Sequence, residues 1–229
     1  MLKSSTRKTP STKATNPRAG RPSREMAGDV DKRIMDAATR VFLARGLEGA
    51  TIDEIAKAAG ASKPTLYSRY SGKEELFAAV IESDIARVFL YADVEYESDS
   101  VRERLEHFVL MMLTIALERR VVALLRIVIA EASRFPALAR AADESARKKG
   151  SLIIARILKE AAENGELPAL QRTSHDSLLQ TAEFYLNLTF LPLEMRALVG
   201  EDIKVLKAQS TKQVSAATRF FLKSCGVAD

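Results

Sequence analysis

Tryptophan is absent from the 229-residue sequence, which has only 10 glycines and 7 prolines. This scarcity favours an all-α fold, because β-rich domains need many turns built from glycine and proline. The single cysteine, Cys225, excludes an internal disulfide and a zinc site made of several cysteines. No apolar run reaches the roughly 18 residues of a membrane span, and the basic N-terminus lacks the apolar segment of a secretory signal. We therefore expect a cytoplasmic protein with no membrane partner.

Positive charge is concentrated in the first part of the chain. Residues 1–27 carry seven Lys and Arg side chains and one glutamate, a net charge of +6, whereas the whole chain carries +5. This stretch is rich in Ser, Thr and Pro and has little to bury, so we expect a disordered basic arm. Such an arm suits a polyanion, and Arg21 in Gly20-Arg21-Pro22 suits a narrow minor groove. A tail that only aids solubility is the alternative.

Two short helices joined by a tight turn are predicted over residues 51–70, TIDEIAKAAGASKPTLYSRY. Thr51 is a good N-cap for the first helix, and Gly60 can end it in the left-handed conformation. Ser62 is the next N-cap, and Pro64 falls in the first turn, where a backbone N–H is not missed. This order of signals predicts a helix-turn-helix.

The outward face of this pair suits DNA. Leu66 is expected to point inward, whereas the remaining side chains mix cations, hydroxyls and small or planar apolar groups that can meet phosphates and bases. An ordinary surface hairpin is the alternative. The predicted DNA-binding residues are Thr51, Ser62, Lys63, Pro64, Thr65, Tyr67, Arg69, Tyr70 and Lys73, together with Arg21 of the arm.

Apolar periodicity predicts about nine helices in all. Residues 93–99 are acidic and predict a loop, Pro192 should kink the eighth helix, and Lys148-Lys149-Gly150 could interrupt the seventh. Beyond the helix-turn-helix, the expected helices cover residues 29–45, 73 to about 92, 100–117, 119–135, 136–164, 174–199 and 202–224.

Residues 34–80 resemble the DNA-binding domain of TetR-family transcriptional regulators. The resemblance rests on a helix ending in Phe42-x-x-x-Gly46, then Thr51-Ile52, Ile55-Ala56, Ala59-Gly60, Leu66-Tyr67 and Lys73-Glu74-Glu75-Leu76. The segment 124–139, LLRIVIAEASRFPALA, resembles the AefR-like branch of the family's C-terminal domains. This resemblance implies an arm (1–27), a helix-turn-helix domain (28–75) and a ligand-binding and dimerisation domain (76–229).

The resemblance also implies a small apolar or amphipathic effector, held in a cavity among the fourth to eighth helices. For the Met and aromatic residues a plain core is the alternative, for His107 a hydrogen-bonded structural role, and for Arg126 pairing with nearby acids. The candidate ligand-binding residues are Phe89, His107, Phe108, Met111, Met112, Arg126, Phe184, Tyr185 and Leu188.

Palindromic operator DNA requires a homodimer, for which residues 174–224 provide the predicted surface in a four-helix arrangement. Its apolar positions include Leu178, Leu179, Phe184, Leu188, Val205, Val214, Phe220 and Phe221.

The resulting hypothesis is a ligand-released repressor that binds double-stranded operator DNA. A ligand-independent architectural or partner-binding protein is the main alternative. An enzyme with a DNA-binding appendage is a third, but we find no Ser/His/Asp order, Cys/His pair, glycine-rich phosphate loop or metal cluster in the sequence. We therefore expect no catalytic residues, no cofactor and no metal.

Overall fold

The computed structural model describes residues 24–90 and 100–226, in which all regular structure is helical. The predicted all-α class, with a helix-turn-helix followed by a helical bundle, is confirmed. Residues 1–23 of the predicted basic arm, including Arg21, and the predicted acidic loop at 93–99 lie outside the described residues. Residues 24–27, which were expected to belong to the disordered arm, instead form the start of the first helix.

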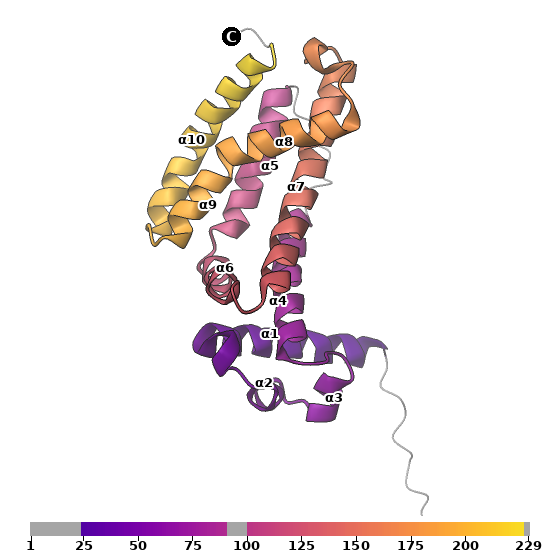
Figure 1. The fold of residues 1–229 in the computed structure, drawn as a ribbon, viewed down its shortest axis with the longest axis vertical. Helices are drawn as coiled ribbons and strands as arrows, with labels where there is room; N and C mark the ends of the chain where they lie inside the picture. Colours follow the sequence, from indigo (N-terminus) through magenta and orange to yellow (C-terminus); the bar gives the residue numbers. More distant parts are fainter. Residues whose placement is uncertain (1–23, 91–99, 227–229) are drawn as a thin grey trace, which may run out of the picture.

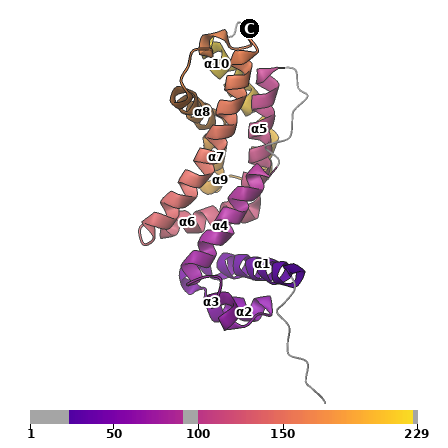
Figure 2. The same ribbon diagram turned by 90° about the vertical axis from the view of Figure 1, so that its right-hand side faces the viewer.

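The helix-turn-helix end of the molecule is formed by α1 (Arg24–Gly49), α2 (Ile52–Ala59), α3 (Lys63–Tyr67) and the first turns of α4 (Lys73–Phe89) (Figure 1). Gly46 interrupts α1 as predicted, because its φ of 69° lies in the left-handed region that a residue with a Cβ avoids. The α4 helix then runs upward from this end into the bundle (Figure 2).

The bundle contains the remaining helices (Figure 1). They are α5 (Val101–Ala116), α6 (Arg119–Glu131), α7 (Pro136–Glu163), the short 3-10 helix η1 (Pro168–Leu170), α8 (His175–Thr189), α9 (Leu191–Leu198) and α10 (Ile203–Ser224).

The predicted eighth helix, residues 174–199, is two helices rather than one kinked helix. Pro192 lies in the first turn of α9, where its missing N–H costs nothing, and Thr189 ends α8. The proline therefore starts a new helix at the position where a kink was expected.

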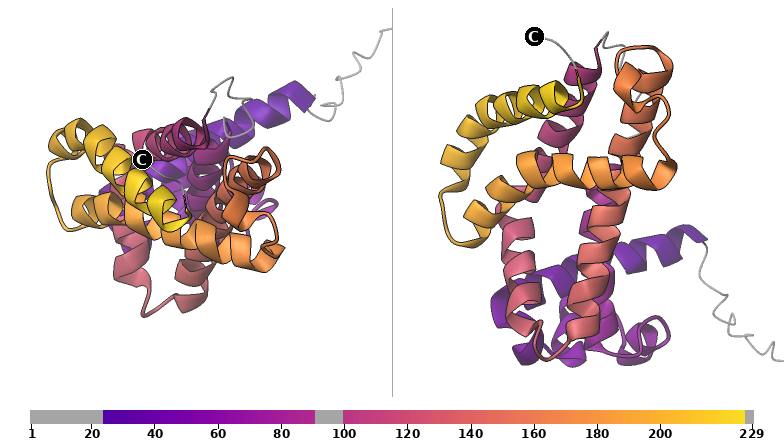
Figure 3. Two further views of the ribbon diagram at one scale, coloured as in Figure 1. Left: turned by 90° about the horizontal axis from the view of Figure 1, so that it is seen from above. Right: turned by 45° about the horizontal axis from the view of Figure 1, so that its top comes forward.

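The predicted interruption of the seventh helix at residues 148–150 is wrong, because α7 is continuous from Pro136 to Glu163. A Cβ at Gly150 would lie 3.2 Å from Leu186 Cδ1 and 3.6 Å from Met112 Cε. The glycine therefore allows α8 to cross close to α7 (Figure 3).

Two hydrophobic cores meet along α4. Leu76, Phe77, Val80 and Ile81 pack in the first core with α1, α2 and α3, while Val88 belongs to the core of the bundle. The α6 helix is shared in the same way, since Val122 lies in the bundle core and Leu124 and Val128 lie in the first.

No helix among the described residues is long and apolar enough to cross a membrane.

A partly buried acid lies in the bundle. Glu194 on α9 has a pKa raised to about 7, chiefly because burial disfavours the charged form and secondly because Asp143 on α7 is a nearby negative charge. The folded chain therefore binds the Glu194 proton more tightly than the unfolded chain does. The stability gained in this way is complete below the ordinary value of 4.5 and is lost as the pH rises through about 7.

We therefore expect the loss of the Glu194 proton to lower the free energy of unfolding by about 1–3 kcal/mol between pH 5 and pH 8. Urea denaturation of the wild type and Glu194→Gln at both pH values measures it, because the amide cannot titrate. Glu160→Gln, at an exposed position of α7, is the control. An unchanged pH dependence in Glu194→Gln would show that the acid is solvated.

Candidate nucleic-acid interface

The first helix of the predicted pair is capped at both ends. Thr51 Oγ1 accepts a hydrogen bond from the backbone N–H of Glu54 at 3.2 Å. Gly60, with φ of 60°, ends α2, and the N–H of Ala61 donates to the Ala56 carbonyl at 3.0 Å. These caps satisfy backbone groups that a short helix leaves unpaired, so the turn has a defined geometry.

The second helix begins at the next cap. Ser62 Oγ accepts from the Thr65 N–H at 3.2 Å and also pairs with Thr65 Oγ1 at 2.8 Å. Leu66 is fully buried in the first core, whereas Tyr67 is 56% exposed. The helical phase predicted for α3 is therefore confirmed.

The exposed or half-exposed members of the predicted DNA-binding set belong to α3 and to the N-caps of α2 and α3. These two helices lie at the end of the molecule away from the bundle (Figure 1). Lys63 is the cation in this group, and its Nζ pairs with Asp53 Oδ2 at 2.5 Å. Both side chains are more than half exposed, so the pair adds little stability and leaves the ammonium able to meet a phosphate. The group comprises Thr51, Ser62, Lys63, Pro64, Thr65 and Tyr67.

Arg69 and Tyr70 are engaged within the domain. Arg69 Nε donates to Asp31 Oδ1 on α1, and Nη1 donates to the Thr65 carbonyl at 3.2 Å. The Tyr70 hydroxyl lies 3.6 Å from Met35 Sδ, and burial together with the Asp31 charge raises its pKa. These contacts fix α3 against α1, which is a positioning role that the sequence did not indicate.

Lys73, at the start of α4, has a similar role. Its Nζ donates to the carbonyls of Glu48 at 2.7 Å and Ala50 at 3.3 Å, just before the Thr51 cap. The α4 helix is thereby tied to the chain that leads into α2. An ammonium has three donors, so the third stays available for a phosphate.

Arg33 is a positioning residue that sequence reasoning missed. Its Nη1 donates to the Ala59 carbonyl at 3.2 Å and therefore holds α1 against the end of α2. The 26-residue separation in sequence leaves no local signal for this contact.

The structure brings only part of the candidate ligand-binding set together. Phe108, Met112 and Tyr185 pack in the bundle core, with Phe89 and Met111 beside it, whereas Phe184 and Leu188 are exposed on the other side of α8. His107 is also exposed, and Arg126 donates to the carbonyls of Ala197 at 2.8 Å and Leu198 at 3.0 Å. The ligand-binding role of the set stays a prediction.

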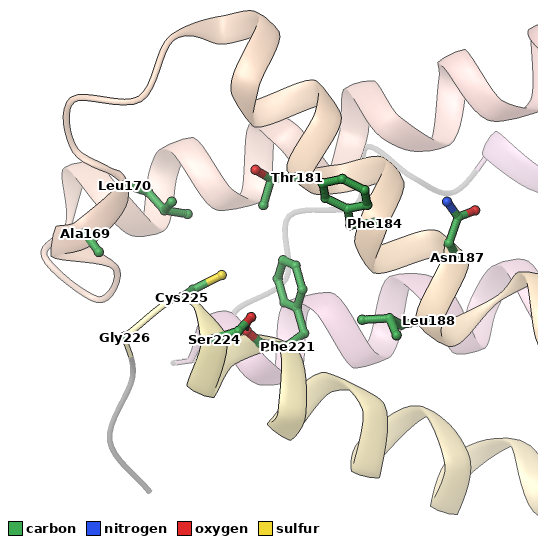
Figure 4. A pocket seen from close by; sticks show the side chains of 10 residues that line it. All are labelled: Ala169, Leu170, Thr181, Phe184, Asn187, Leu188, Phe221, Ser224, Cys225 and Gly226. Atoms are coloured by element: carbon green, nitrogen blue, oxygen red, sulfur yellow. Dashed lines mark hydrogen bonds between the residues drawn. The ribbon is translucent and has the colours of Figure 1, made fainter.

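An open apolar groove lies where η1, α8 and α10 meet, with a volume of about 710 Å³. Phe184, Leu188 and Phe221 face it, and Cys225 lies at its end (Figure 4). Burial raises the pKa of the Cys225 thiol. A smaller hollow of about 360 Å³ lies between Arg119 and Arg126 of α6 and the turn that leads into α10.

Three residues of the predicted dimer surface are not surface residues. Val214 is fully buried, and Phe221 packs its ring against Tyr185 with centroids 4.9 Å apart. Leu178 is buried as well. These side chains face the chain's own core because α8 and α10 pack against each other, so charge at Val214 or Phe221 would test folding rather than assembly.

The described part of the chain contains no group of three or more His, Cys, Asp and Glu residues that could hold a metal ion.

Two family models match this chain. One, described as bacterial regulatory proteins of the tetR family, matches residues 34–80. The other, described as the C-terminal domain of AefR-like transcriptional repressors, matches residues 103–226, which is more than half of the chain.

Curated relatives match over the helix-turn-helix region. The HTH-type transcriptional regulator SrpR of Pseudomonas putida is 42% identical over 57 residues, which are 25% of this chain and 27% of SrpR. The matched part thus spans about a quarter of that relative.

Solved structures match over most of their length. A TetR-family transcriptional regulator of Mesorhizobium loti superposes with a TM-score of 0.70 at 24% identity, over 86% of this chain and 97% of that one. The flavonoid-responsive regulator FrrA gives a TM-score of 0.64 at 29% identity, with the same two coverages.

Tyr67→Ala should leave the free energy of unfolding within about 0.5 kcal/mol of the wild type, because the side chain is mostly exposed. Leu66→Ala should lower it by about 2–5 kcal/mol, since it empties a buried site. Chemical denaturation measures both, and a DNA-binding assay should show strong weakening for Tyr67→Ala in spite of its stability. The reverse ranking of the two stabilities would contradict the placement of α3.

Proposed function

This chain belongs to the TetR family of bacterial transcriptional regulators and carries an AefR-like C-terminal domain, and from that premise we propose that it is a ligand-released repressor. In this proposal a homodimer binds a palindromic operator, and a small apolar or amphipathic molecule releases it. The observation that carries the DNA-binding part is the solvent-facing group on α2 and α3, with Tyr67 exposed beside a buried Leu66.

The exposed group on α3 and the two N-caps, which we call the recognition surface, is chemically suited to contact both phosphates and bases. Hydroxyls of Thr51, Ser62 and Thr65 can donate to phosphate oxygens, and Lys63 supplies charge. Tyr67 and Pro64 offer flat apolar surface to base edges and thymine methyl groups. The internal contacts of Arg69, Tyr70 and Lys73 hold this surface in place, so less ordering is needed when DNA binds.

Footprinting on genomic fragments, including the DNA upstream of the protein's own gene, should reveal a protected palindrome. Affinity should fall linearly with salt on a log–log plot, with a slope of about −0.9 for each phosphate neutralised. Lys63→Gln removes one phosphate contact from each protomer and should therefore make the slope of the dimer about 1.8 less steep, whereas Lys159→Gln on the exposed face of α7 should leave it unchanged. Equal slopes for the wild type and Lys63→Gln would remove Lys63 from the interface.

The effector part of the proposal is supported by the likeness to FrrA, whose name describes a flavonoid-responsive regulator. Flavonoids are therefore the first compounds to titrate against the protein–operator complex, followed by acyl chains as a second amphipathic class. An effector must weaken operator binding by the same factor by which the operator weakens effector binding. A molecule that binds the free protein yet leaves operator affinity unchanged would favour the architectural alternative.

The assembly part is supported by exposed apolar side chains on α8, α9 and α10. Phe220 is 68% exposed, although it is an aromatic residue on a regular helix. Exposed apolar side chains on neighbouring helices suit an interaction site, and palindromic DNA needs two reading heads about 34–36 Å apart or a multiple of that distance. The other exposed members are Phe184, Leu188, Leu191, Met195, Val199 and Val205.

Phe220→Asp should give a folded monomer that binds the operator weakly, because the charge enters the apolar surface without touching the core. Light scattering at micromolar concentration measures the mass, and circular dichroism checks the fold. Ile129→Asp is the matched control, since Ile129 is 57% exposed but lies on α6. A native protein that is already monomeric would contradict the proposed assembly.

A further inference from the structure

A buried charge interrupts the apolar face of α4 between the two cores. Ile81 packs in the first core and Val88 in the bundle core, and Asp84 lies between them, only 6% exposed. A carboxylate at such a position is costly unless it is fully paired.

Three side chains surround Asp84. Arg120, in the first turn of α6, donates from Nη2 to Asp84 Oδ1. Arg87, one turn along α4, has Nη2 3.5 Å from the same oxygen. Arg87 also donates to both carboxylate oxygens of Glu118, at 3.2 and 2.7 Å, and Glu118 is the N-cap residue of α6. We call these four residues the seam cluster; it joins α4 to the start of α6.

The seam cluster is incompletely paired. Asp84 Oδ2 and Arg87 Nε are buried and have no hydrogen-bond partner in the described part of the chain. Burial raises the pKa of Asp84, although both arginines act in the opposite direction. Arg87 thus lies between two carboxylates. Both oxygens of Glu118 already accept hydrogen bonds from it, whereas one oxygen of Asp84 has no hydrogen-bond partner.

This geometry differs physically from the cores on either side. An apolar core resists sliding, because every displacement opens voids. An ion cluster with a free acceptor can exchange partners through a side-chain rotation, since Arg87 can turn from Glu118 to the unpaired oxygen of Asp84. Glu118 has a side chain that is 36% exposed, so water can solvate it once Arg87 has turned away. The start of α6 can therefore shift against α4 without burying an unpaired charge.

We propose that the seam cluster is a two-state coupling device. Asp84 is the positioning residue that links the position of α4 to the position of α6. The inference rests on the proposed function, because DNA bound at α3 must alter α4 for the device to be used. A static ion pair that only stabilises the fold is the competing interpretation.

The diagnostic variant replaces the buried pair of Asp84 and Arg120 by apolar side chains. Asp84→Leu/Arg120→Met leaves the neutral Arg87–Glu118 pair and lets the two cores become continuous. Replacing a buried ion pair in this way is often neutral or stabilising, so the melting temperature should be retained or raised. Asp84→Leu by itself should lower the melting temperature by roughly 6–20 °C, because it leaves Arg120 without its partner. The control, Lys159→Met/Glu163→Leu, removes an exposed pair on α7.

Amide hydrogen exchange in the free protein tests the device without DNA. Residues 82–88 and 119–124 should exchange faster than either core in the wild type and in the control. In Asp84→Leu/Arg120→Met they should slow by at least about tenfold, to the rate of the cores. Wild-type exchange at the seam as slow as in the cores would overturn the proposal.

Adding a duplex that contains the mapped operator tests whether DNA binding acts through the seam cluster. In the wild type, DNA binding should change the exchange of residues 119–124 on α6, as reciprocity between coupled sites requires. The double variant should bind the duplex but lose at least half of that change. An undiminished response in the double variant overturns the proposal. Failure of the wild type to bind any duplex overturns the proposed function instead, and the free-protein experiment then decides on the seam cluster.

Discussion

One helix must bury apolar side chains in two separate cores, and the rest of the molecule is arranged around that constraint. Phe77 of α4 packs edge-on against Phe42 of α1, with ring centroids 4.9 Å apart, while Val88 packs in the bundle. Neither end of α4 can turn freely about the helix axis, because each is held by its own packed neighbours. The orientation of α2 and α3 relative to the bundle therefore follows from the direction of α4.

The helix-turn-helix end illustrates how few side chains are needed to set a recognition surface on such a helix. Backbone caps at Thr51, Gly60 and Ser62 fix the pair of helices internally. Arg69, Tyr70 and Lys73 then fix the pair to α1 and to the loop before α2. The residues that support the surface thus follow directly after α3, in the connection to α4 and at the first residue of α4, whereas the residues that form it lie on α3 and at the two N-caps.

Local signals made much of the fold predictable from sequence. Caps, glycines and the 3.6-residue period act within one turn, and they correctly gave the helical class, the Gly46 and Gly60 breaks and the buried position of Leu66. The same rules failed at Gly150, where the close approach of Leu186 on α8 leaves little room for a side chain, and at Pro192, which lies in the first turn of a new helix where a kink was expected. The hydrogen-bond partners of Arg69 and Lys73 lie 38 and 25 residues away in the sequence, so no local pattern predicts them. Which face of α8 and α10 is turned outward also depends on three-dimensional packing, and this is why Val214 and Phe221 were misplaced.

The contact between Arg126 and the carbonyls of Ala197 and Leu198 has a consequence for how such a protein can evolve. The last carbonyls of a helix lack partners within it, and here α6 supplies them for α9. The same helix places Leu124 and Val128 in the first core and Val122 in the bundle core. The buried and hydrogen-bonded faces of α6 are thereby committed to different neighbours, and a substitution there affects several of them together. Inherited variation that retunes one property at a time is consequently easier on a helix such as α5, whose clustered core side chains lie in the bundle core alone.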